Sequence, residues 1–350
     1  MKMAQEVKVK EMLELVQGSQ AVLVDVRSPA EFAEMTIPGS INIPIFDNEE
    51  RAEVGTLYKQ VSVEEAKDRA LEIVSAKLPG FIRSFQKLGS PIIVFCWRGG
   101  MRSKTTVTLL ELMGIRARRL QGGVKAHRRW VIEQLERLDI RPDSFILNGG
   151  TGSGKTAMLR KLKERGIPTL DLEGLANHRG SIFGQIGLQP VNQKMFEVAL
   201  VHDMLNMQEA SYLVFEAESK RMGKILLPES IMNKKRESTH IFIELPLEVR
   251  VQNILNEYKP AEHHQACIEA FEKIKRRLHT PVAAEIQELL DNKDYALAVQ
   301  LLLEHYYDPR YLHSEKEYEL CRKVTIQAKD IEDAVQQLYA YLEKQPVAFS

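Results

Sequence analysis

The chain has 350 residues, of which 44% are hydrophobic and 27% are charged, and its formal net charge is zero. This length favours two domains, and the composition is typical of a globular protein rather than a disordered or fibrous one. No stretch is apolar enough to cross a bilayer, and the first residues lack the apolar core of a secretory signal, so we expect a cytoplasmic protein.

The first half of the chain alternates short apolar runs with helical patterns. Strands are predicted at 21–26 and 91–96, and helices at 63–76, 102–113 and 124–138. Such alternation indicates a mainly parallel sheet with helices on both faces, because parallel neighbours need crossover connections. Pro142 then interrupts the helical pattern, and there we place the boundary between domains 8–139 and 140–350.

A second alternation follows this boundary. Strands are predicted at 144–148, 168–172, 212–216 and 240–245, and a helix at 155–165. A second α/β domain with a parallel sheet is therefore predicted. The chain beyond Pro246 is mainly helical, with a last helix at 331–343, and we expect this C-terminal region to pack on the second domain.

Three cysteines lie far apart in the sequence, Cys96, Cys267 and Cys321. Their odd number and wide spacing fit neither a disulfide framework nor a clustered zinc site, and we predict no metal site built from them. Cys267 and Cys321 lie in helical or mixed segments and are interpreted as packing residues. Thiol chemistry would therefore belong to Cys96.

Cys96 ends a predicted strand and is followed by Arg98, Gly99, Gly100 and Arg102. Glycines allow backbone N–H groups to form an anion-binding nest, to which the helix that begins near Arg102 adds its positive end. A helix N-terminus and nearby arginines stabilise a thiolate. We predict that Cys96 is a nucleophile in a loop that binds an anion.

A basic segment includes this loop and the residues after it. Between residues 98 and 129 the chain has nine lysines or arginines against the single acid Glu111. This excess favours an anionic partner, although a solvated surface balanced by acidic helices explains a charge run equally well. The candidate contacts are Arg116, Arg118, Arg119, Lys125, Arg128 and Arg129.

The second domain begins with a phosphate-binding loop. Residues 149–156 read GGTGSGKT, which matches G-x-x-x-x-G-K-[ST] between a predicted strand and a predicted helix. Lys155 would neutralise phosphate charge, and the Thr156 hydroxyl is a candidate ligand for Mg²⁺. The backbone N–H groups that would surround the phosphate belong to Gly149, Gly150, Thr151, Gly152, Ser153 and Gly154.

Acidic side chains follow two further predicted strands, and the candidates are Asp171, Glu173, Glu216 and Glu218. Glu216 ends a strand at the point where a nucleotide hydrolase carries the acid that supports magnesium, usually an aspartate. Asp171 and Glu173 are equally well interpreted as helix-capping carboxylates. No water-activating residue is evident, so a diphosphate ester bound without hydrolysis is at least as well supported as ATP turnover.

The Cys96 loop resembles that of the rhodanese family, and so do two segments before it, at residues 25–32 and 37–44. The resemblance implies that Asp25 and Arg27 shape the fold around the loop. The C-x5-R spacing from Cys96 to Arg102 is one residue longer than in ordinary sulfurtransferases, and rhodanese-fold phosphatases share it. The spacing therefore leaves open phosphate hydrolysis and attack on a selenium- or sulfur-bearing phosphate.

A rhodanese-like domain followed by a P-loop domain is similar to the tRNA 2-selenouridine synthase family. The segments that carry this resemblance are residues 96–103, 149–156, 171–181, 215–219 and 307–311. It implies a transferase that converts 2-thiouridine at the tRNA wobble position into 2-selenouridine, through S-geranylation by geranyl diphosphate and then selenation by selenophosphate. Cys96 would carry selenium as a selanyl group, the P-loop would hold the diphosphate, and the basic segment would meet tRNA phosphates.

Two other classes of protein share parts of this pattern. A rhodanese-fold phosphatase or arsenate reductase with a nucleotide-binding regulatory domain would turn over phosphate esters without tRNA. A non-enzymatic, RNA-binding ATP switch would tolerate Cys96→Ser.

Overall fold

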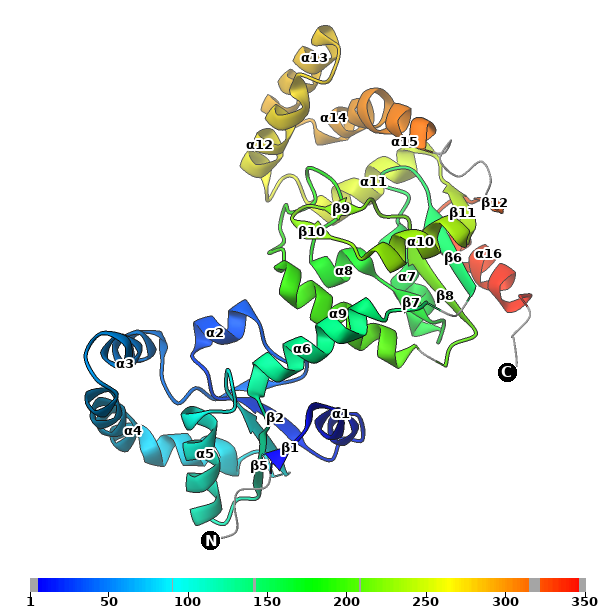
Figure 1. The fold of residues 1–350 in the computed structure, drawn as a ribbon. Helices are drawn as coiled ribbons and strands as arrows, with labels where there is room; N and C mark the ends of the chain where they lie inside the picture. Colours follow the sequence, from blue (N-terminus) through cyan, green and yellow to red (C-terminus); the bar gives the residue numbers. More distant parts are fainter. Residues whose placement is uncertain (1–5, 90, 141–142, 208, 315–321, 346–350) are drawn as a thin grey trace. The chain divides into compact units, whose positions relative to one another are not determined.

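The structure is a computed structural model, and it describes residues 6–89, 91–140, 143–207, 209–314 and 322–345. The chain forms two compact units, one of residues 1–137 with 197–201 and one of 138–196 with 202–350. Each unit contains a five-stranded sheet whose paired strands are all parallel, so the fold-class prediction is confirmed (Figure 1). Pro142, on which the predicted boundary rests, lies outside the described residues, as does Cys321.

The sheet of the first unit has the order β1-β5-β4-β2-β3. Its strands are β1 (Glu6–Val7), β2 (Val22–Asp25), β3 (Ile41–Asn42), β4 (Ile92–Phe95) and β5 (Ala117–Leu120). The helices are α1 (Val9–Gln17), α2 (Pro29–Glu34), α3 (Asn48–Gln60), α4 (Val63–Gln86), α5 (Met101–Leu112) and α6 (Gly123–Glu136). The central strand β4 is buried along its whole length, and Cys96 follows it directly at the edge where ligands of parallel sheets bind.

Several elements of this unit differ from the sequence-based prediction: β1, β3, α1, α2 and α3 were not predicted, and α4 and β5 differ for identifiable reasons. Helix α4 continues ten residues past the predicted end at Ala76, through Pro79, because Phe81 and Phe85 beyond the proline are buried in the core. That burial outweighs the hydrogen bond that proline removes. Strand β5 was not predicted, since its sequence, Ala-Arg-Arg-Leu, has no apolar run, and pairing with β1 and β4 fixes it as a strand.

The sheet of the second unit has the order β12-β11-β6-β8-β7, beside a small antiparallel hairpin. Its strands are β6 (Asp143–Asn148), β7 (Thr169–Leu170), β8 (Tyr212–Glu216), β9 (Arg221–Met222), β10 (Ile225–Leu226), β11 (Thr239–Glu244) and β12 (Lys323–Gln327). Its first helices are α7 (Lys155–Glu164), α8 (Leu172–Ala176), α9 (Gln193–Asn206), part of which groups with the first unit, α10 (Glu229–Glu237) and α11 (Leu247–Tyr258). The helical region after them comprises α12 (His264–Lys275), α13 (Thr280–Asp291), α14 (Tyr295–Leu302), η1 (Leu303–Tyr307), α15 (Asp308–Ser314) and α16 (Ile331–Glu343).

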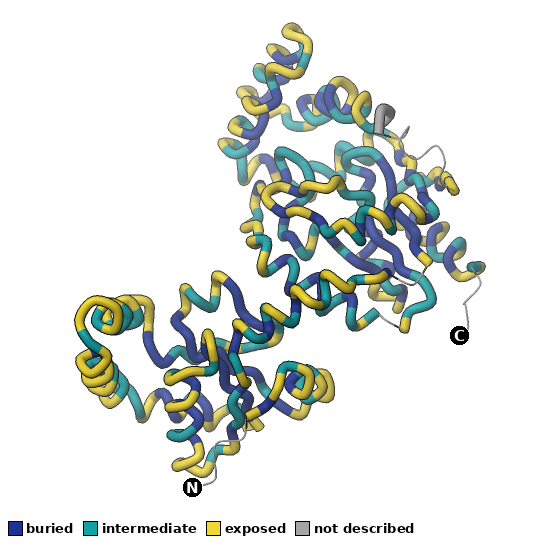
Figure 2. Tube along the Cα trace, viewed as in Figure 1, coloured by how far each residue is buried: buried dark blue, intermediate teal, exposed yellow. Residues whose placement is uncertain are grey.

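The C-terminal region packs on the second unit, as predicted. Side chains of α16, among them Val335 and Leu338, share one hydrophobic core with Leu159 and Leu162 of α7. Helices α12, α13 and α14 form a smaller core of their own around Phe271. Figure 2 shows buried residues running along the strands of both sheets, and no helix in the described ranges combines the length and the apolar character needed to span a membrane.

Candidate functional sites

The first candidate site is the loop between β4 and α5. Cys96 is only 3% exposed, and its Sγ lies 3.2 Å from the hydroxyl oxygen of Ser103, a buried residue in the first turn of α5. Gly99 has φ +65°, a conformation that favours glycine. Ser103 was not singled out in the sequence, although its place seven residues after Cys96 puts it on the helix that the loop enters.

The loop carbonyls are held from behind by β5 and α6. The N–H groups of Val124 and Lys125 donate to the carbonyl oxygens of Cys96 and Trp97 at 3.0 and 2.9 Å, and the Arg119 guanidinium donates to Gly99 O at 2.8 Å. Because a trans peptide directs its N–H opposite to its C=O, the amides of residues 97, 98 and 100 point away from these donors. Their arrangement as an anion-binding nest stays a prediction.

Arg102 does not lie free beside the cysteine. Its guanidinium donates two hydrogen bonds to the Glu31 carboxylate, at 2.5 and 3.0 Å. Burial acts to raise the pKa of Glu31, but the Arg102 hydrogen bond and charge, with Ser28 N–H and Arg51, outweigh it and lower that pKa. The pair therefore ties α5 to α2, and Arg98, which is exposed, is the loop arginine open to a ligand.

Asp25 and Arg27 form a buried ion pair at the end of β2, with Nη2 and Oδ2 2.6 Å apart. Arg27 also donates to Met35 O at 2.5 Å, and Thr36 donates to Asp25 at 2.9 Å. These bonds fix the segment after β2. This geometry agrees with the structural role that the resemblance implies for the pair.

The six basic candidates divide into two groups. Three are held in ion pairs with acids: Arg118 with Glu11, Arg119 with Glu6 and Arg128 with Glu197. The other three are exposed and form no ion pair within the described ranges: Arg116, Lys125 and Arg129. A balanced surface thus accounts for the first group, and the second group is open to an anionic partner.

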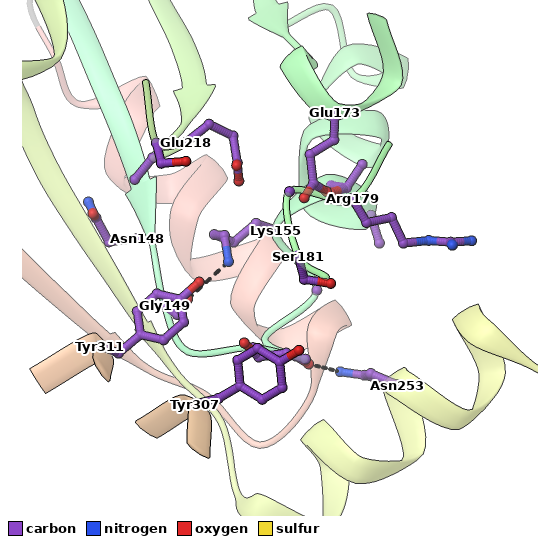
Figure 3. Close-up of a pocket in the computed structure, with 18 of the residues that line it drawn as sticks. Asn148, Gly149, Lys155, Glu173, Arg179, Ser181, Glu218, Asn253, Tyr307 and Tyr311 are labelled. Atoms are coloured by element: carbon purple, nitrogen blue, oxygen red, sulfur yellow. Dashed lines mark hydrogen bonds between the residues drawn. The ribbon is translucent and has the colours of Figure 1, made fainter. Parts of the chain in front are cut away.

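The second candidate site is the loop between β6 and α7. Gly149, Gly152 and Gly154 have φ values of +154°, +81° and +77°. A Cβ at Gly152 would lie 2.6 Å from Arg250 O, so the close approach of α11 leaves no room for a side chain at this position. The ammonium group of Lys155 donates to Gly149 O at 2.9 Å (Figure 3).

Three acidic side chains gather beside the helix that follows this loop. The Thr156 hydroxyl is 2.7 Å from Glu173 Oε2 and 3.2 Å from Glu216 Oε2, and Glu173 N–H donates to Glu216 at 2.8 Å. Glu218 and Glu173 line a cleft beside Lys155, which we call the P-loop cleft. Asp171 instead accepts from Gly174 N–H and caps α8, as the capping interpretation expects. The role of Glu173 at this site stays a prediction.

Burial makes these carboxyls unusually weak acids. It raises the pKa of Glu173 to about 7, with the charge of Glu218 as the next cause, and raises that of the fully buried Glu216 well above its usual range, with Glu173 as the next cause. Burial opposes charge on Lys155, yet Tyr311 and the three glutamates outweigh it and raise the lysine pKa. The cleft therefore keeps a cation and partly neutral acids where a phosphate would bind.

Oxygen donors for a magnesium ion are present at this point. The Thr156 hydroxyl and the carboxylates of Glu173 and Glu216 fit the hard oxygen ligands that Mg²⁺ prefers. Among the residues described, no three acidic, histidine or cysteine side chains are arranged to hold a metal by themselves. A magnesium ion would therefore depend on phosphate oxygens as further ligands.

Several residues of the P-loop site were not found from the sequence. Arg250 donates to Thr151 O at 3.0 Å and pairs with Asp308 at 2.6 Å, and Asn253 donates to Gly152 O at 2.9 Å. Arg250 and Asn253 come from α11, 99 and 101 residues from the loop residues they contact, and no local motif marks them. Asp308 lies in segment 307–311, which the family resemblance includes, but its contact with Arg250 was not predicted. Tyr258, Tyr307 and Tyr311 also line the cleft, whose volume is about 1040 Å³.

Cys267 has no comparable surroundings. It is buried in a small cluster with Ile186 and Ala270, and burial raises its pKa to about 11. The thiol is therefore protonated at neutral pH, as expected for a packing residue.

Comparison with known proteins covers both units. The tRNA 2-selenouridine synthase AAA domain matches residues 142–342, and the rhodanese-like domain matches residues 8–129. The tRNA 2-selenouridine synthase of Bdellovibrio bacteriovorus is 33% identical over 83% of this chain and 88% of its own length. Those of Nitrosomonas eutropha and Sulfurovum sp. are 33% and 34% identical over 89% and 83% of this chain, and over 82% and 87% of their own lengths. On this evidence, with the cysteine loop and the phosphate loop both formed, the chain belongs to the tRNA 2-selenouridine synthase family.

Proposed function

We propose that the protein is a transferase that converts 2-thiouridine in tRNA into 2-selenouridine, by S-geranylation followed by selenation. The observation that carries the proposal is the similarity to relatives with this name over more than four fifths of the chain, which includes both loops. The hydrogen bonds of the Cys96 loop and of the P-loop support the step assigned to each.

The P-loop site would perform the geranylation. The thiouridine sulfur attacks C1 of geranyl diphosphate, an S–C bond forms, the C1–O bond breaks, and diphosphate leaves with the electron pair. The N3 proton of the base passes to solvent or to a basic group. Lys155 and the loop amides stabilise the charge that develops on the leaving diphosphate.

Thr156 with Glu173 and Glu216 would hold a magnesium ion at the same place. When bound, the ion would neutralise further charge on the leaving group. The three residues also position one another without it, through the hydrogen bonds of the Thr156 hydroxyl.

The Cys96 loop would perform the selenation. The exchange of S-geranyl-2-thiouridine with hydrogen selenophosphate and one water gives 2-selenouridine, geranylthiol and hydrogen phosphate, with no net oxidation. We assign the binding of the tetrahedral donor to the loop amides and Arg98, and the attack on the donor to the Cys96 thiolate. The thiolate attacks phosphorus, an S–P bond forms and the P–Se bond breaks, and selenide leaves with the electron pair. Water then hydrolyses the S-phosphocysteine to phosphate and the thiol, and the selenide adds to C2 of the base, where the C2–S bond breaks and geranylthiolate leaves. A selanyl group on Cys96 would need a two-electron oxidant, so this route does not use one. Ser103 and the Arg102–Glu31 pair would position the loop and are not assigned to the chemistry.

The test separates the two steps with two variants. The protein is incubated with thiolated tRNA, geranyl diphosphate and selenophosphate, and the digested nucleosides are weighed by mass spectrometry. Cys96→Ser should accumulate the geranylated nucleoside and form no selenated one, whereas Lys155→Ala should form neither. Lys155→Ala should still selenate tRNA that is supplied already geranylated, which shows that the variant is folded.

The matched control is Cys321→Ser, which removes a thiol that the sequence places outside both loops and should keep both activities. Geranylation that survives in Lys155→Ala would contradict the assignment of the P-loop. Normal selenation by Cys96→Ser would contradict the assignment of the nucleophile. Phosphatase turnover without tRNA, lost in Cys96→Ser, would favour the phosphatase class instead.

A further inference from the structure

A small apolar pocket adjoins the P-loop cleft. It has a volume of about 60 Å³ and lies between α11 and the helices α13 and α14. Its inner wall is formed by buried aliphatic side chains, among them Leu290, Leu302 and Leu303, with Ala298 and Val299 beside them. No charged side chain lines it among the residues described.

The tyrosines in the wall present their rings more than their hydroxyls. The Tyr295 hydroxyl lies 3.0 Å from His264 Nδ1, and the Tyr258 hydroxyl lies 3.4 Å from Ser181 Oγ. Both hydroxyls therefore have partners outside the pocket. A polar or charged group of a ligand would find no hydrogen-bond partner in this pocket, so its burial would cost free energy. The pocket therefore favours an apolar ligand group.

The pocket and the P-loop cleft are adjacent and share part of their lining. Four residues line both: Thr151, Ile254, Tyr258 and Tyr307. Thr151 belongs to the phosphate loop itself, and Figure 3 shows Tyr307 beside that loop. One ligand with an anionic head and a hydrocarbon tail could therefore occupy both spaces, whereas a nucleoside would place hydroxyls and ring nitrogens against aliphatic side chains.

We infer that this pocket, with Val299 and Leu302 in its wall, binds the hydrocarbon tail of an allylic diphosphate whose head lies on the P-loop, and limits the length of that tail. The inference rests on the proposed geranylation. At about 10–15 Å³ for each water-sized group, a pocket of 60 Å³ holds roughly one five-carbon unit. The other five-carbon unit of a geranyl chain then lies at the mouth, between Tyr258 and Tyr307.

This placement also gives the two tyrosines a role. In the transition state, C1 of the allylic chain gains positive charge as the bond to diphosphate breaks. An aromatic ring face stabilises a nearby positive charge. Ring faces at the mouth would thus meet the reacting end of the chain, while the aliphatic wall meets its far end.

The test measures binding of pyrophosphate and of dimethylallyl, geranyl and farnesyl diphosphates to the full-length protein by calorimetry. Geranyl diphosphate should bind about tenfold or more tighter than pyrophosphate, and farnesyl diphosphate should bind no tighter than geranyl diphosphate. Val299→Phe fills the pocket, so it should weaken geranyl diphosphate binding by about tenfold and leave pyrophosphate binding unchanged.

Leu297→Phe is the matched control, because this exposed residue lies on α14 outside the pocket lining and should change neither affinity. If Val299→Phe unfolds the protein, Leu302→Ala replaces it and should instead increase the affinity for farnesyl diphosphate. Equal affinities of the wild type for pyrophosphate and geranyl diphosphate would overturn the pocket assignment and leave the P-loop assignment standing. If neither compound bound, the proposed geranylation itself would fall.

Discussion

At the scale of single residues, Glu173 is a buried acid whose charge changes near neutral pH. Its carboxyl lies beside Thr156 and faces the cleft that Lys155 also lines. Burial first, and the charge of Glu218 second, raise its pKa to about 7. The side chain is therefore mostly neutral at pH 6 and mostly ionised at pH 8, and the cleft gains a negative charge between these values.

This change predicts a pH dependence of diphosphate binding without metal. Ionised Glu173 repels a bound anion, so pyrophosphate affinity in EDTA should fall as pH rises through about 7, relative to Glu173→Gln at each pH. The difference between the two proteins should be small at pH 6 and about threefold to tenfold at pH 8. Titration calorimetry measures it, and comparison at equal pH cancels the ionisation of pyrophosphate itself.

Asp171→Asn is the control for this prediction. It removes an acid from the same segment, but Asp171 caps α8 and does not contact Thr156. The ratio of the pyrophosphate affinity of Asp171→Asn to that of the wild type should not change between pH 6 and pH 8. A level ratio for Glu173→Gln as well would show that Glu173 does not titrate beside the bound anion.

At the scale of elements, the start of α6 fixes the shape of the cysteine loop. Gly123 has φ +57°, and a Cβ there would lie 2.0 Å from the carbonyl oxygen of Cys96. The first turn of α6 can approach the loop and donate to its carbonyls only because no side chain intervenes. Packing between α6 and the loop, rather than the loop sequence alone, therefore directs the loop amides.

Gly123→Ala should consequently damage the first site and spare the second. We expect a destabilisation of the first unit of about 1–3 kcal/mol, from the clash and the positive φ, and at least a tenfold loss of selenation. Geranylation should stay within about twofold of the wild type, since the P-loop lies in the other unit. Thermal unfolding and the nucleoside assay measure these effects.

Gly80→Ala provides the comparison. Gly80 lies inside α4, and a Cβ at this position meets nothing within 4 Å. Helix propensity then makes the substitution neutral or slightly stabilising. Selenation that is preserved in Gly123→Ala would mean that the loop does not depend on contact with α6.

At the scale of the whole molecule, each candidate site is built within one unit. The residues around Cys96 belong to the first unit, and the P-loop with its tyrosines belongs to the second. In the proposed function, geranylated tRNA made at the P-loop site is the substrate of the Cys96 site. Neither site takes a described catalytic candidate from the other unit.

This division predicts complementation between two inactive variants. A mixture of Cys96→Ser and Lys155→Ala should form 2-selenouridine, because the first variant makes geranylated tRNA and the second selenates it. The rate should fall when unmodified competitor tRNA is added, since the intermediate is released between proteins. A mixture that accumulates geranylated tRNA without selenation would show that the intermediate does not leave the protein that makes it.

The exposed cations Arg116, Lys125 and Arg129 should carry part of the tRNA affinity. Replacing all three by alanine should lower the slope of log Kd against log salt by about two to three, because each phosphate contact releases about 0.7–0.9 of a counterion. A triple variant of exposed cations on α3 and α4 is the control and should keep the slope: Lys59, Lys67 and Arg83 to alanine. An unchanged slope in the first variant would assign these residues to a solvated surface.

The sequence by itself determined both parallel sheets and both loops. Short apolar runs and glycine-rich turns are local patterns, and they identified the strand before Cys96 and the loop before Lys155 without tertiary information. Elements stabilised by distant partners were missed. Strand β5 carries Arg118 and Arg119 and has no apolar run, so it becomes a strand only by pairing with its neighbours β1 and β4.

Only the tertiary structure decided which side chains meet. Arg102 pairs with Glu31, and Arg250 from α11 donates to the phosphate loop. Asp171 caps α8, whereas Glu173 lies beside Thr156. The tertiary structure also places an apolar pocket of the C-terminal helices beside the phosphate loop. The physical reason is that burial and ion pairing depend on contacts between residues far apart in the chain, and no local pattern encodes those contacts.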